Sequence, residues 1–203
     1  MVRTGLYFAA VPAFAGGFLG WQGWWAPAAP LLGLAGFVLF FFRDPERAAP
    51  SVPGAILAPA DGKVLAVEEV ILDGQAQIQV SIFLSIFDVH VNRAPIAGRI
   101  EAVHYRPGKF HIASTRRASR ENERNEIVLE SDGGRVVVRQ IAGLVARRIE
   151  FWREIGDQVE RGERLGMIRF GSRAEVVFDR RCRVEVRPGQ HVRAGVSVLA
   201  VRE

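Results

Sequence analysis

A long run without charged residues opens the chain, and its polar break divides it into two helices. Between Arg3 and Arg43 there is no Asp, Glu, Lys or Arg. Near its middle the run is interrupted by GWQGWWAP, where two Gly, a Gln and a Pro favour a turn. A membrane-spanning helix needs ~20 consecutive apolar residues. We therefore predict a hydrophobic helical hairpin over about 5–20 and 27–42, whose short limbs leave a spanning and a shallow re-entrant hairpin both open.

The flanks of this run predict where it lies in the cell. The Trp residues at the turn fit the headgroup zone, where an amphipathic ring contacts both water and lipid. Arg3, Arg43 and Arg47 would all face the cytoplasm under the positive-inside rule. The alternatives are a buried core helix and a signal peptide, whose apolar core has only ~7–15 residues. Residues 1–47 are thus expected to associate with the cell membrane, with the rest of the chain on its cytoplasmic side.

Beyond a proline-rich linker, alternating apolar and polar positions predict a body made mostly of β-strands. The clearest alternation is QIQVSIFL at 77–84, as expected of a strand with one buried face. One short helix is suggested around 114–123. Residues 48–203 are therefore expected to form a mainly β domain, a barrel or sandwich. The other strands are expected at 55–58, 63–70, 99–105, 126–130, 136–141, 147–152, 164–170, 174–178 and 196–201.

One stretch of the body resembles barrels of the lipoyl and biotinyl type. Residues 155–168 read IGDQVERGERLGMI, similar to the signature G-x-x-V-x-x-G-x-x-L-G-x-I, and 188–195 carry a looser copy. The glycines permit tight hairpin turns, with Val159 and Leu165 pointing inward. A carrier domain would present a Lys at a hairpin tip, and neither stretch contains one. We expect lipoyl-like barrel-hybrid character without a carrier function.

Charge and cysteine content narrow the expected partners. The formal net charge is +5, almost all of it from Arg, which favours lipid headgroups or nucleic acid. No aromatic residues are interleaved with the main Arg cluster, so anionic membrane lipid is expected and nucleic acid is not. Cys182 is the sole cysteine, and three of the His residues have no recognised metal spacing, so neither a disulfide nor a metal site is expected. The Arg cluster consists of Arg116, Arg117, Arg120 and Arg124, and the three His residues are His104, His111 and His191.

Four short segments, taken in order, carry a more specific resemblance. They are APADGKV at 58–64, FLSIFDVHVNRAP at 83–95, ENERN at 121–125 and RFGSR at 169–173. The chain resembles the phosphatidylserine decarboxylase proenzymes of the short, pyruvoyl-dependent bacterial and archaeal type. The segments are similar to that family's P-x-D-G, F-L-S…D-x-H, N-E-R and cleavage-site motifs. The likeness covers about residues 50–180, and the hydrophobic N-terminus also fits it.

The resemblance implies a self-processing enzyme. The chain would be cut between Gly171 and Ser172 into a large β chain, 1–171, and a small α chain, 172–203, which form a heterodimer; further oligomerisation is left open. Ser172 would become a pyruvoyl cofactor, with no pyridoxal phosphate and no metal. Its ketone would form a Schiff base with the serine amine of phosphatidylserine, giving phosphatidylethanolamine and CO2. An ether-lipid serine analogue is the alternative substrate.

The residues at the cleavage site suit this chemistry. Ser172 Oγ can add to the carbonyl carbon of Gly171 and give an ester, from which β-elimination and hydrolysis lead to a pyruvoyl group and ammonia. Gly171 admits a sharply turned backbone because it has no Cβ. A hydroxyl is a weak nucleophile and needs a base. His90 is the best candidate for that base, with Asp61 or Asp88 orienting its ring.

One position departs from the family pattern. Longer members carry a second His three residues after the first, usually assigned to self-cleavage with the Asp, whereas this chain has Arg93 there. The triad of Asp61, His90 and Ser172 is therefore an inference from this chain's own residues. Arg93 is expected to bind the substrate phosphate or carboxylate through its forked donors, and Asp88 is a further substrate-binding candidate.

Two other functions fit parts of the pattern. A membrane-anchored lipoyl-like barrel could serve as an adaptor in an export assembly, although such adaptors typically carry long helical hairpins that are not readable in this sequence. An anchored zinc peptidase would need His and Asp ligands at spacings that the sequence does not contain. Only the decarboxylase hypothesis predicts a chain break between Gly171 and Ser172.

Overall fold

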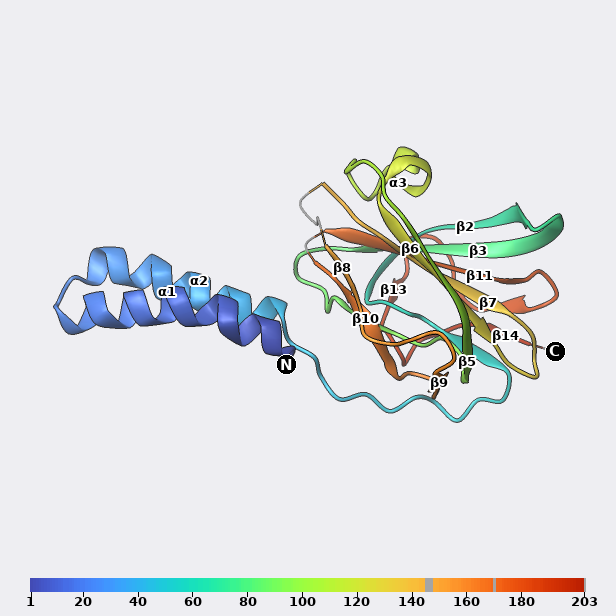
Figure 1. The fold of residues 1–203 in the computed structure, drawn as a ribbon, viewed down its shortest axis with the longest axis horizontal. Coiled ribbons are helices and arrows are strands. Elements are labelled where there is room, and N and C mark those ends of the chain that lie inside the picture. Colours follow the sequence, from blue (N-terminus) through green and yellow to red (C-terminus); the bar gives the residue numbers. More distant parts are fainter. Residues whose placement is uncertain (145–147, 170, 203) are drawn as a thin grey trace. The chain divides into compact units, whose positions relative to one another are not determined.

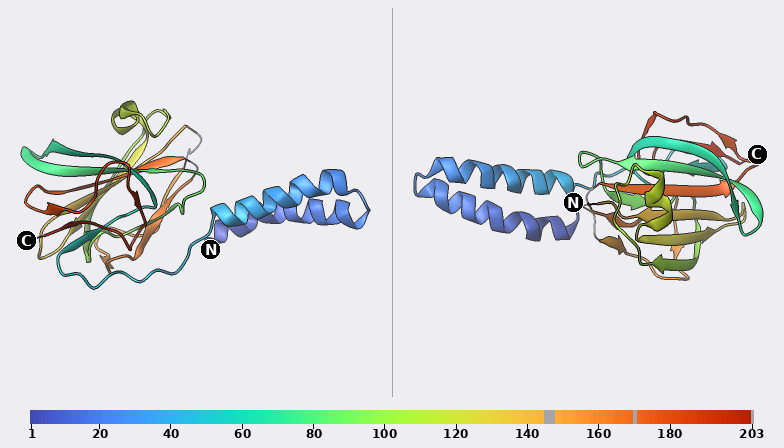
Figure 2. Two further views of the ribbon diagram at one scale, coloured as in Figure 1. Left: turned by 180° about the vertical axis from the view of Figure 1, so that it is seen from behind. Right: turned by 90° about the horizontal axis from the view of Figure 1, so that it is seen from above.

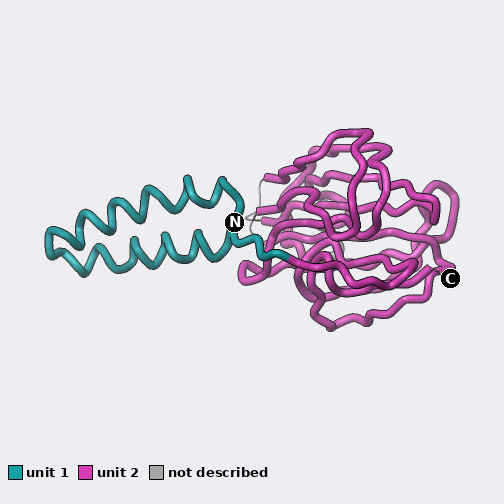
Figure 3. Tube along the Cα trace, turned by 90° about the horizontal axis from the view of Figure 1, so that it is seen from below, with its two compact units in different colours: residues 1–46 teal, residues 47–203 magenta. Residues whose placement is uncertain are grey.

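The structure is a computed structural model that describes residues 1–144, 148–169 and 171–202. The chain divides into two compact units, Met1–Glu46 and Arg47–Glu203 (Figure 3). Two expected features reach outside the described residues, namely the start of a strand at residue 147 and Phe170 of the expected cleavage segment. The residues expected to carry the chemistry all belong to the second unit.

The first unit is a pair of helices. α1 (Arg3–Trp21) and α2 (Trp25–Phe41) lie side by side and are joined by a short turn (Figures 1 and 2). The open end of the pair is closed by a hydrogen bond of 3.0 Å from the Val2 N–H to the Phe42 carbonyl. The helices therefore occur where the uncharged run predicts them. Among the described residues, no helix is both long enough and apolar enough to cross a membrane.

The second unit is built around one curled eight-stranded sheet with the strand order β13-β2-β3-β11-β7-β6-β5-β9 (Figure 1). Two three-stranded sheets, β1-β14-β12 and β4-β10-β8, complete the unit, and a short helix, α3, precedes β6. The mainly β class predicted from the sequence is confirmed. The elements are β1 (Ala55–Leu57), β2 (Gly62–Leu72), β3 (Gln75–Leu84), β4 (Val91–Arg93), β5 (Gly98–Arg106), α3 (Arg116–Glu121), β6 (Arg124–Glu130), β7 (Val136–Ile141), β8 (Ile149–Phe151), β9 (Gln158–Val159), β10 (Arg164–Ile168), β11 (Ser172–Asp179), β12 (Arg183–Val184), β13 (His191–Val192) and β14 (Val198–Val201).

The main hydrophobic core lies against one face of the large sheet. In β11 this core contains Ala174, Val176 and Phe178, all of them fully buried. Successive residues of a strand point to opposite faces, so Arg173 points to the other face. The same alternation places Ser172, the first residue of β11, on the core side. The expected nucleophile is therefore an interior residue of the fold.

Four short strands are not predicted by the sequence pattern. β4, β9, β12 and β13 have only two or three residues each, which is too short for alternation to show. Their positions depend on partners far away in the sequence, as when β4 pairs with β10. In the stretch similar to lipoyl barrels, Gly156 and Gly162 adopt positive φ angles of 99° and 84°, which suits tight turns. The lipoyl-like character of the whole body stays a prediction.

Candidate active site

Three neighbouring strands bring expected site residues to one edge of the large sheet. β3 ends at Leu84, which pairs with Ser172 at the start of β11. On the other side of β3, Lys63 of β2 pairs with Phe83, so Asp61 stands just beyond the same edge. Because adjacent strands lie ~4.8 Å apart, the backbones of Asp61 and Ser172 are separated by about 10 Å. The sheet register thus places both residues near one another.

His90 reaches the same edge through the segment that follows β3. Residues 85–90 lead from β3 in the large sheet to β4 in a small sheet, and the chain returns from β10 of that small sheet to β11. The Ile168 N–H donates to the His90 carbonyl at 3.3 Å, and Ile168 precedes Ser172 by only four positions. Figure 1 shows β10 ending near the start of β11. His90 and Ser172 therefore share one junction between two sheets.

Ser172 combines complete burial with an unused hydroxyl. Its exposure is 0%, and among the described residues its Oγ has no hydrogen-bond partner. Burying a hydroxyl without a partner costs about 1–3 kcal/mol, so such a group calls for an explanation. The preceding Gly171 has a φ of 57°, in the left-handed region that glycine adopts without strain. The expected cleavage site is thus a turned backbone followed by a fully buried nucleophile that has no hydrogen-bond partner among the described residues.

Gly143 lies directly against the carbonyl expected to be attacked. The β7–β11 ladder pairs Ile141 with Arg173, and its continuation brings Gly143 next to Gly171. A Cβ built on Gly143 would overlap the Gly171 carbonyl oxygen and would also press on Ala113. Glycine is therefore required at this position to leave room for that carbonyl group.

We expect Gly143→Ala to slow cleavage between Gly171 and Ser172 by roughly 100-fold, because even a ~1 Å displacement of a reacting group can have that effect. The fraction of cut chain, followed over time by intact mass, measures it. Gly36→Ala is the control, since a Cβ there meets nothing within 4 Å. Cleavage of the Gly143 variant at the wild-type rate would show that this close approach does not position the carbonyl.

The ring of His90 is oriented by a backbone carbonyl. His90 is fully buried, and its Nδ1 lies 3.0 Å from the Asp88 carbonyl oxygen. A carbonyl only accepts, so Nδ1 carries the proton, and in the neutral ring Nε2 holds the lone pair. The Asp88 carboxylate instead accepts hydrogen bonds from the Ser85 N–H at 2.8 Å and the Ser85 hydroxyl at 2.7 Å. Asp88 thus orients the ring through its main chain, while its side chain shapes the turn.

The Asp61 carboxylate is held by Arg47, which the sequence predicts only as a positive charge flanking the helical hairpin. Arg47 forms a two-pronged ion pair with the Asp61 carboxylate, with Nη2 2.7 Å from Oδ2 and Nη1 bonded to Oδ1. The Ala194 N–H also donates to Oδ1 at 2.8 Å. These donors fix the carboxylate at the edge that carries Ser172. No local pattern around Arg47 signals this contact, because its partner is fixed by the fold.

Arg93, expected to bind substrate, is almost completely buried. Its Nη1 donates to the Gly162 carbonyl at 3.0 Å, and its N–H donates to the Pro59 carbonyl at 2.9 Å. At least one guanidinium donor is therefore used within the fold. Binding of a substrate phosphate or carboxylate by Arg93 stays a prediction.

A row of three buried amides lies on the core side of the sheet beside Ser172. Asn125 Nδ2 donates to Gln140 Oε1 at 3.2 Å, and Gln140 Nε2 donates to Asn92 Oδ1 at 2.9 Å. Gln140 pairs with Ala174, the neighbour of Ser172 on that face. The sequence gives no signal for this row, since it joins three strands that are distant along the chain.

The opposite face of the sheet anchors the start of β11. Arg173 Nη2 donates to the Ser81 hydroxyl at 2.7 Å, and Arg173 Nε lies 2.9 Å from Glu175 Oε1. The Ser119 hydroxyl, carried by α3, donates to the same carboxylate at 2.8 Å. These contacts fix the strand that begins with Ser172 without using its inner face.

The segment around α3 borders the site and is held by one carboxylate. Glu121 accepts hydrogen bonds from Lys109, His111 and Arg117. These bonds, that from Lys109 foremost, lower the Glu121 pKa to about 2. The adjacent Asn122 donates to the Ala142 carbonyl at 2.7 Å, next to Gly143. The carboxylate therefore stays ionised over the ordinary pH range and keeps this segment in place.

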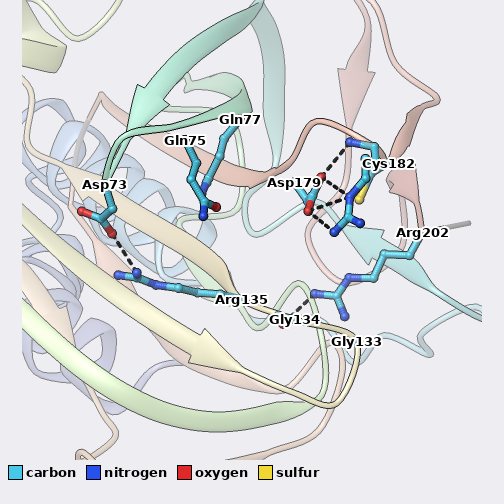
Figure 4. Close-up of a pocket in the computed structure, with 10 residues that line it drawn as sticks. Asp73, Gln75, Gln77, Gly133, Gly134, Arg135, Asp179, Cys182 and Arg202 are labelled. Carbon is cyan, nitrogen blue, oxygen red and sulfur yellow. Dashed lines mark hydrogen bonds and ion pairs between the residues drawn. The ribbon is translucent and has the colours of Figure 1, made fainter.

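A polar pocket lies at the far end of β11 (Figure 4). It is lined by residues near Asp179, seven positions along the strand from Ser172 and thus about 23 Å away. The arginines in it are already engaged, with contacts from Arg135 to Asp73, from Arg181 to Asp179 and from Arg202 to the Gly134 carbonyl. We therefore place the candidate active site at the Ser172 end. In the described part of the chain, no three His, Cys, Asp or Glu side chains are grouped to hold a metal ion.

Comparison with known proteins agrees with the chemistry of this edge. The model of a family described as phosphatidylserine decarboxylase matches residues 34–200. A protein of Solibacter usitatus is 47% identical over 100% of this chain and 97% of its own length. A relative from Symbiobacterium thermophilum is 49% identical, covering 86% of this chain and 83% of that protein. Both relatives are named phosphatidylserine decarboxylase proenzyme, and the chain therefore belongs to the phosphatidylserine decarboxylase family.

Proposed function

We propose that this chain is the proenzyme of a phosphatidylserine decarboxylase that cuts itself between Gly171 and Ser172. The observation that carries the proposal is the buried hydroxyl of Ser172, which has no partner in the described part of the chain and directly follows a left-handed glycine. Both features suit an attack on the preceding peptide carbonyl. Family membership supports the reaction class, and the burial of Ser172 and the turn at Gly171 support the choice of these two residues.

The first step needs only groups of this chain. Ser172 Oγ adds to the Gly171 carbonyl carbon while its proton passes to His90 Nε2, the ring nitrogen with the lone pair. The C–N bond then breaks, the nitrogen of residue 172 takes up a proton, and an ester links Gly171 to Ser172. Asp61 is the candidate for stabilising the charged imidazole. Burial at 0% exposure for Ser172 and His90 keeps water from competing with the hydroxyl.

The second step cuts the chain. A base removes the Cα proton of residue 172, the electron pair forms the Cα–Cβ double bond, and Oγ leaves as part of the Gly171 carboxylate. One water then replaces the nitrogen of residue 172, which leaves as ammonia. The product is a ketone at the new N-terminus of residues 172–203.

The interior around residue 172 fits such a pyruvoyl group. Among the described residues, two buried polar atoms on this side of the sheet, Ser172 Oγ and Asn92 Nδ2, lack hydrogen-bond partners, as expected where a reacting group is to be received. Once formed, the group would supply an electron-withdrawing ketone that condenses with the substrate amine and draws off the electrons left by CO2. The chain would hold it beside His90 and Asn92.

Phosphatidylserine as substrate, phosphatidylethanolamine as product and the association of chains 1–171 and 172–203 form part of the proposal. We further propose a location at the cell membrane with the second unit on the cytoplasmic side, supported by the uncharged run and its Arg flanks. Arg93 and Asp88 are proposed as substrate contacts. Co-sedimentation of the full chain with anionic vesicles, compared with a chain lacking residues 1–46, tests the membrane part.

The intact mass of the purified wild-type protein tests the central proposal. We expect two pieces, residues 1–171 and residues 172–203, the smaller one lighter by one ammonia than a peptide that begins with serine. A carbonyl reagent should label only the smaller piece. A single chain that stays uncut in membranes and does not react with the reagent would overturn the proposal.

A further inference from the structure

The row of buried amides ends in a donor that no described residue accepts from. Asn125 donates to Gln140 and Gln140 donates to Asn92, so Asn92 is the last member of the row and its Oδ1 accepts from Gln140. Asn92 Nδ2 is buried without a hydrogen-bond partner in the described part of the chain. A buried amide N–H left unpaired costs about 1–3 kcal/mol. Aligned amides also polarise each other, which strengthens the last donor.

The register places this donor near the Ser172 hydroxyl, another buried group without a hydrogen-bond partner among the described residues. Gln140 pairs with Ala174, and Ser172 is the next residue of β11 on the same face. Asn92 bonds to Gln140 across the interior, and His90 precedes it by two positions on the same segment. Asn92 and Ser172 are thus both buried on the core side of the large sheet, one beside Gln140 and the other two positions before its partner Ala174. Asn92 offers a donor, and Ser172 an oxygen able to accept.

We propose that Asn92 acts in the second step of self-cleavage, an inference that rests on the proposed function. Its Nδ2 donates a hydrogen bond to Oγ of residue 172 and stabilises the negative charge that develops there. In that step the Cα proton goes to a base, the Cα–Cβ double bond forms, and the Cβ–Oγ bond breaks with both electrons passing to the Gly171 carboxylate. A preorganised donor aimed at developing charge in a dry site typically contributes 10²–10³-fold in rate.

Asn92→Leu tests this assignment against a matched control, Asn125→Leu. Each variant removes one hydrogen bond from Gln140, so both should lose similar thermal stability. Only Asn92→Leu removes the donor facing residue 172. We expect its chain to be cut roughly 10²–10³-fold more slowly, and that of Asn125→Leu within a few-fold of wild type, both measured by intact mass.

Hydroxylamine identifies the step that is slowed. If the ester still forms in Asn92→Leu, hydroxylamine will cleave it and release residues 172–203 beginning with serine instead of a pyruvoyl group. We expect this release. Slow cleavage without hydroxylamine sensitivity would place the defect before the ester and overturn the assignment, as would a cutting rate equal to that of Asn125→Leu.

Asn92→Asp provides the second variant if the leucine variant does not fold. It keeps the oxygen that accepts from Gln140 and replaces Nδ2 by oxygen, and we expect the same slow, hydroxylamine-sensitive chain. Normal cutting of Asn92→Asp would overturn the inference. The intact mass of the wild-type protein, measured in parallel, distinguishes failure of the proposed self-cleavage from failure of the role given to Asn92. An uncut wild-type chain would refute self-cleavage itself.

Discussion

Ser172→Ala is expected to leave a single uncut chain with no decarboxylase activity. Without Oγ no ester can form, so neither the chain break nor the pyruvoyl group can follow. Removing the nucleophile of a catalytic triad lowers rates by on the order of 10⁶, which here lies beyond detection. Intact mass, labelling by a carbonyl reagent and release of CO2 from phosphatidylserine all report the loss.

The same substitution should not weaken the fold. The hydroxyl of Ser172 is buried without a partner among the described residues, so its removal should raise the stability by about 1 kcal/mol, or ~2–4 °C in Tm, relative to the uncut His90→Gln chain. Ser81→Ala is the contrasting control. Ser81 is buried on the opposite face and bonds to Arg173, so its loss should lower the stability by about 1–3 kcal/mol and leave cutting intact. An uncut Ser81→Ala chain would contradict the view that the face of the sheet opposite Ser172 stabilises the fold without taking part in cleavage.

The fold class could be predicted because it rests on local patterns. The uncharged run and its Gly–Pro break predict both helices, and the alternation at 77–84 predicts β3, found at Gln75–Leu84. The short strand β4 could not be found in this way. A strand of three residues is too short to show an alternation of apolar and polar positions, and β4 is held in place by its pairing with β10.

The candidate site likewise contains residues that local motifs predict and residues that only tertiary contacts identify. Gly171, Ser172, His90 and Asp61 are signalled by motifs, and the sheet register brings Ser172 and Asp61 to one edge. Other contributors have no local signature: Arg47, Asn92, Gln140 and Gly143 act through partners between 14 and 48 positions away in the chain. Their roles follow from tertiary contacts, which a single sequence does not encode in any readable spacing.

The side-chain roles of Asp88 and Arg93 illustrate a second limit. Residue type alone makes both attractive contacts for a charged substrate. In the structure the Asp88 carboxylate is occupied by Ser85, and Arg93 donates to the Gly162 carbonyl. A charged residue in a motif can therefore support the turn that presents the reactive residue, and sequence cannot distinguish that role from substrate binding.

His90→Gln is expected to leave the chain folded and uncut, with self-cleavage slowed by ~10²–10⁴-fold, the usual contribution of a general base. Glutamine is polar and of similar length, so the buried position stays filled, yet it cannot take the proton of Ser172. Because the block precedes the ester, hydroxylamine should release nothing from this variant. That result would set it apart from Asn92→Leu, in which the ester is expected to form.

His104→Gln is the matched control for this experiment. His104 lies exposed on β5, paired with Glu126, and its replacement should leave cutting at the wild-type rate. Cutting of the His90 variant within a few-fold of wild type would show that another group takes the proton of Ser172. If hydroxylamine instead released residues 172–203 from the His90→Gln chain, the ester would form without His90. His90 would then act in the second step, as the base that removes the Cα proton of residue 172. The two variants together thus determine which residue serves which half of the reaction.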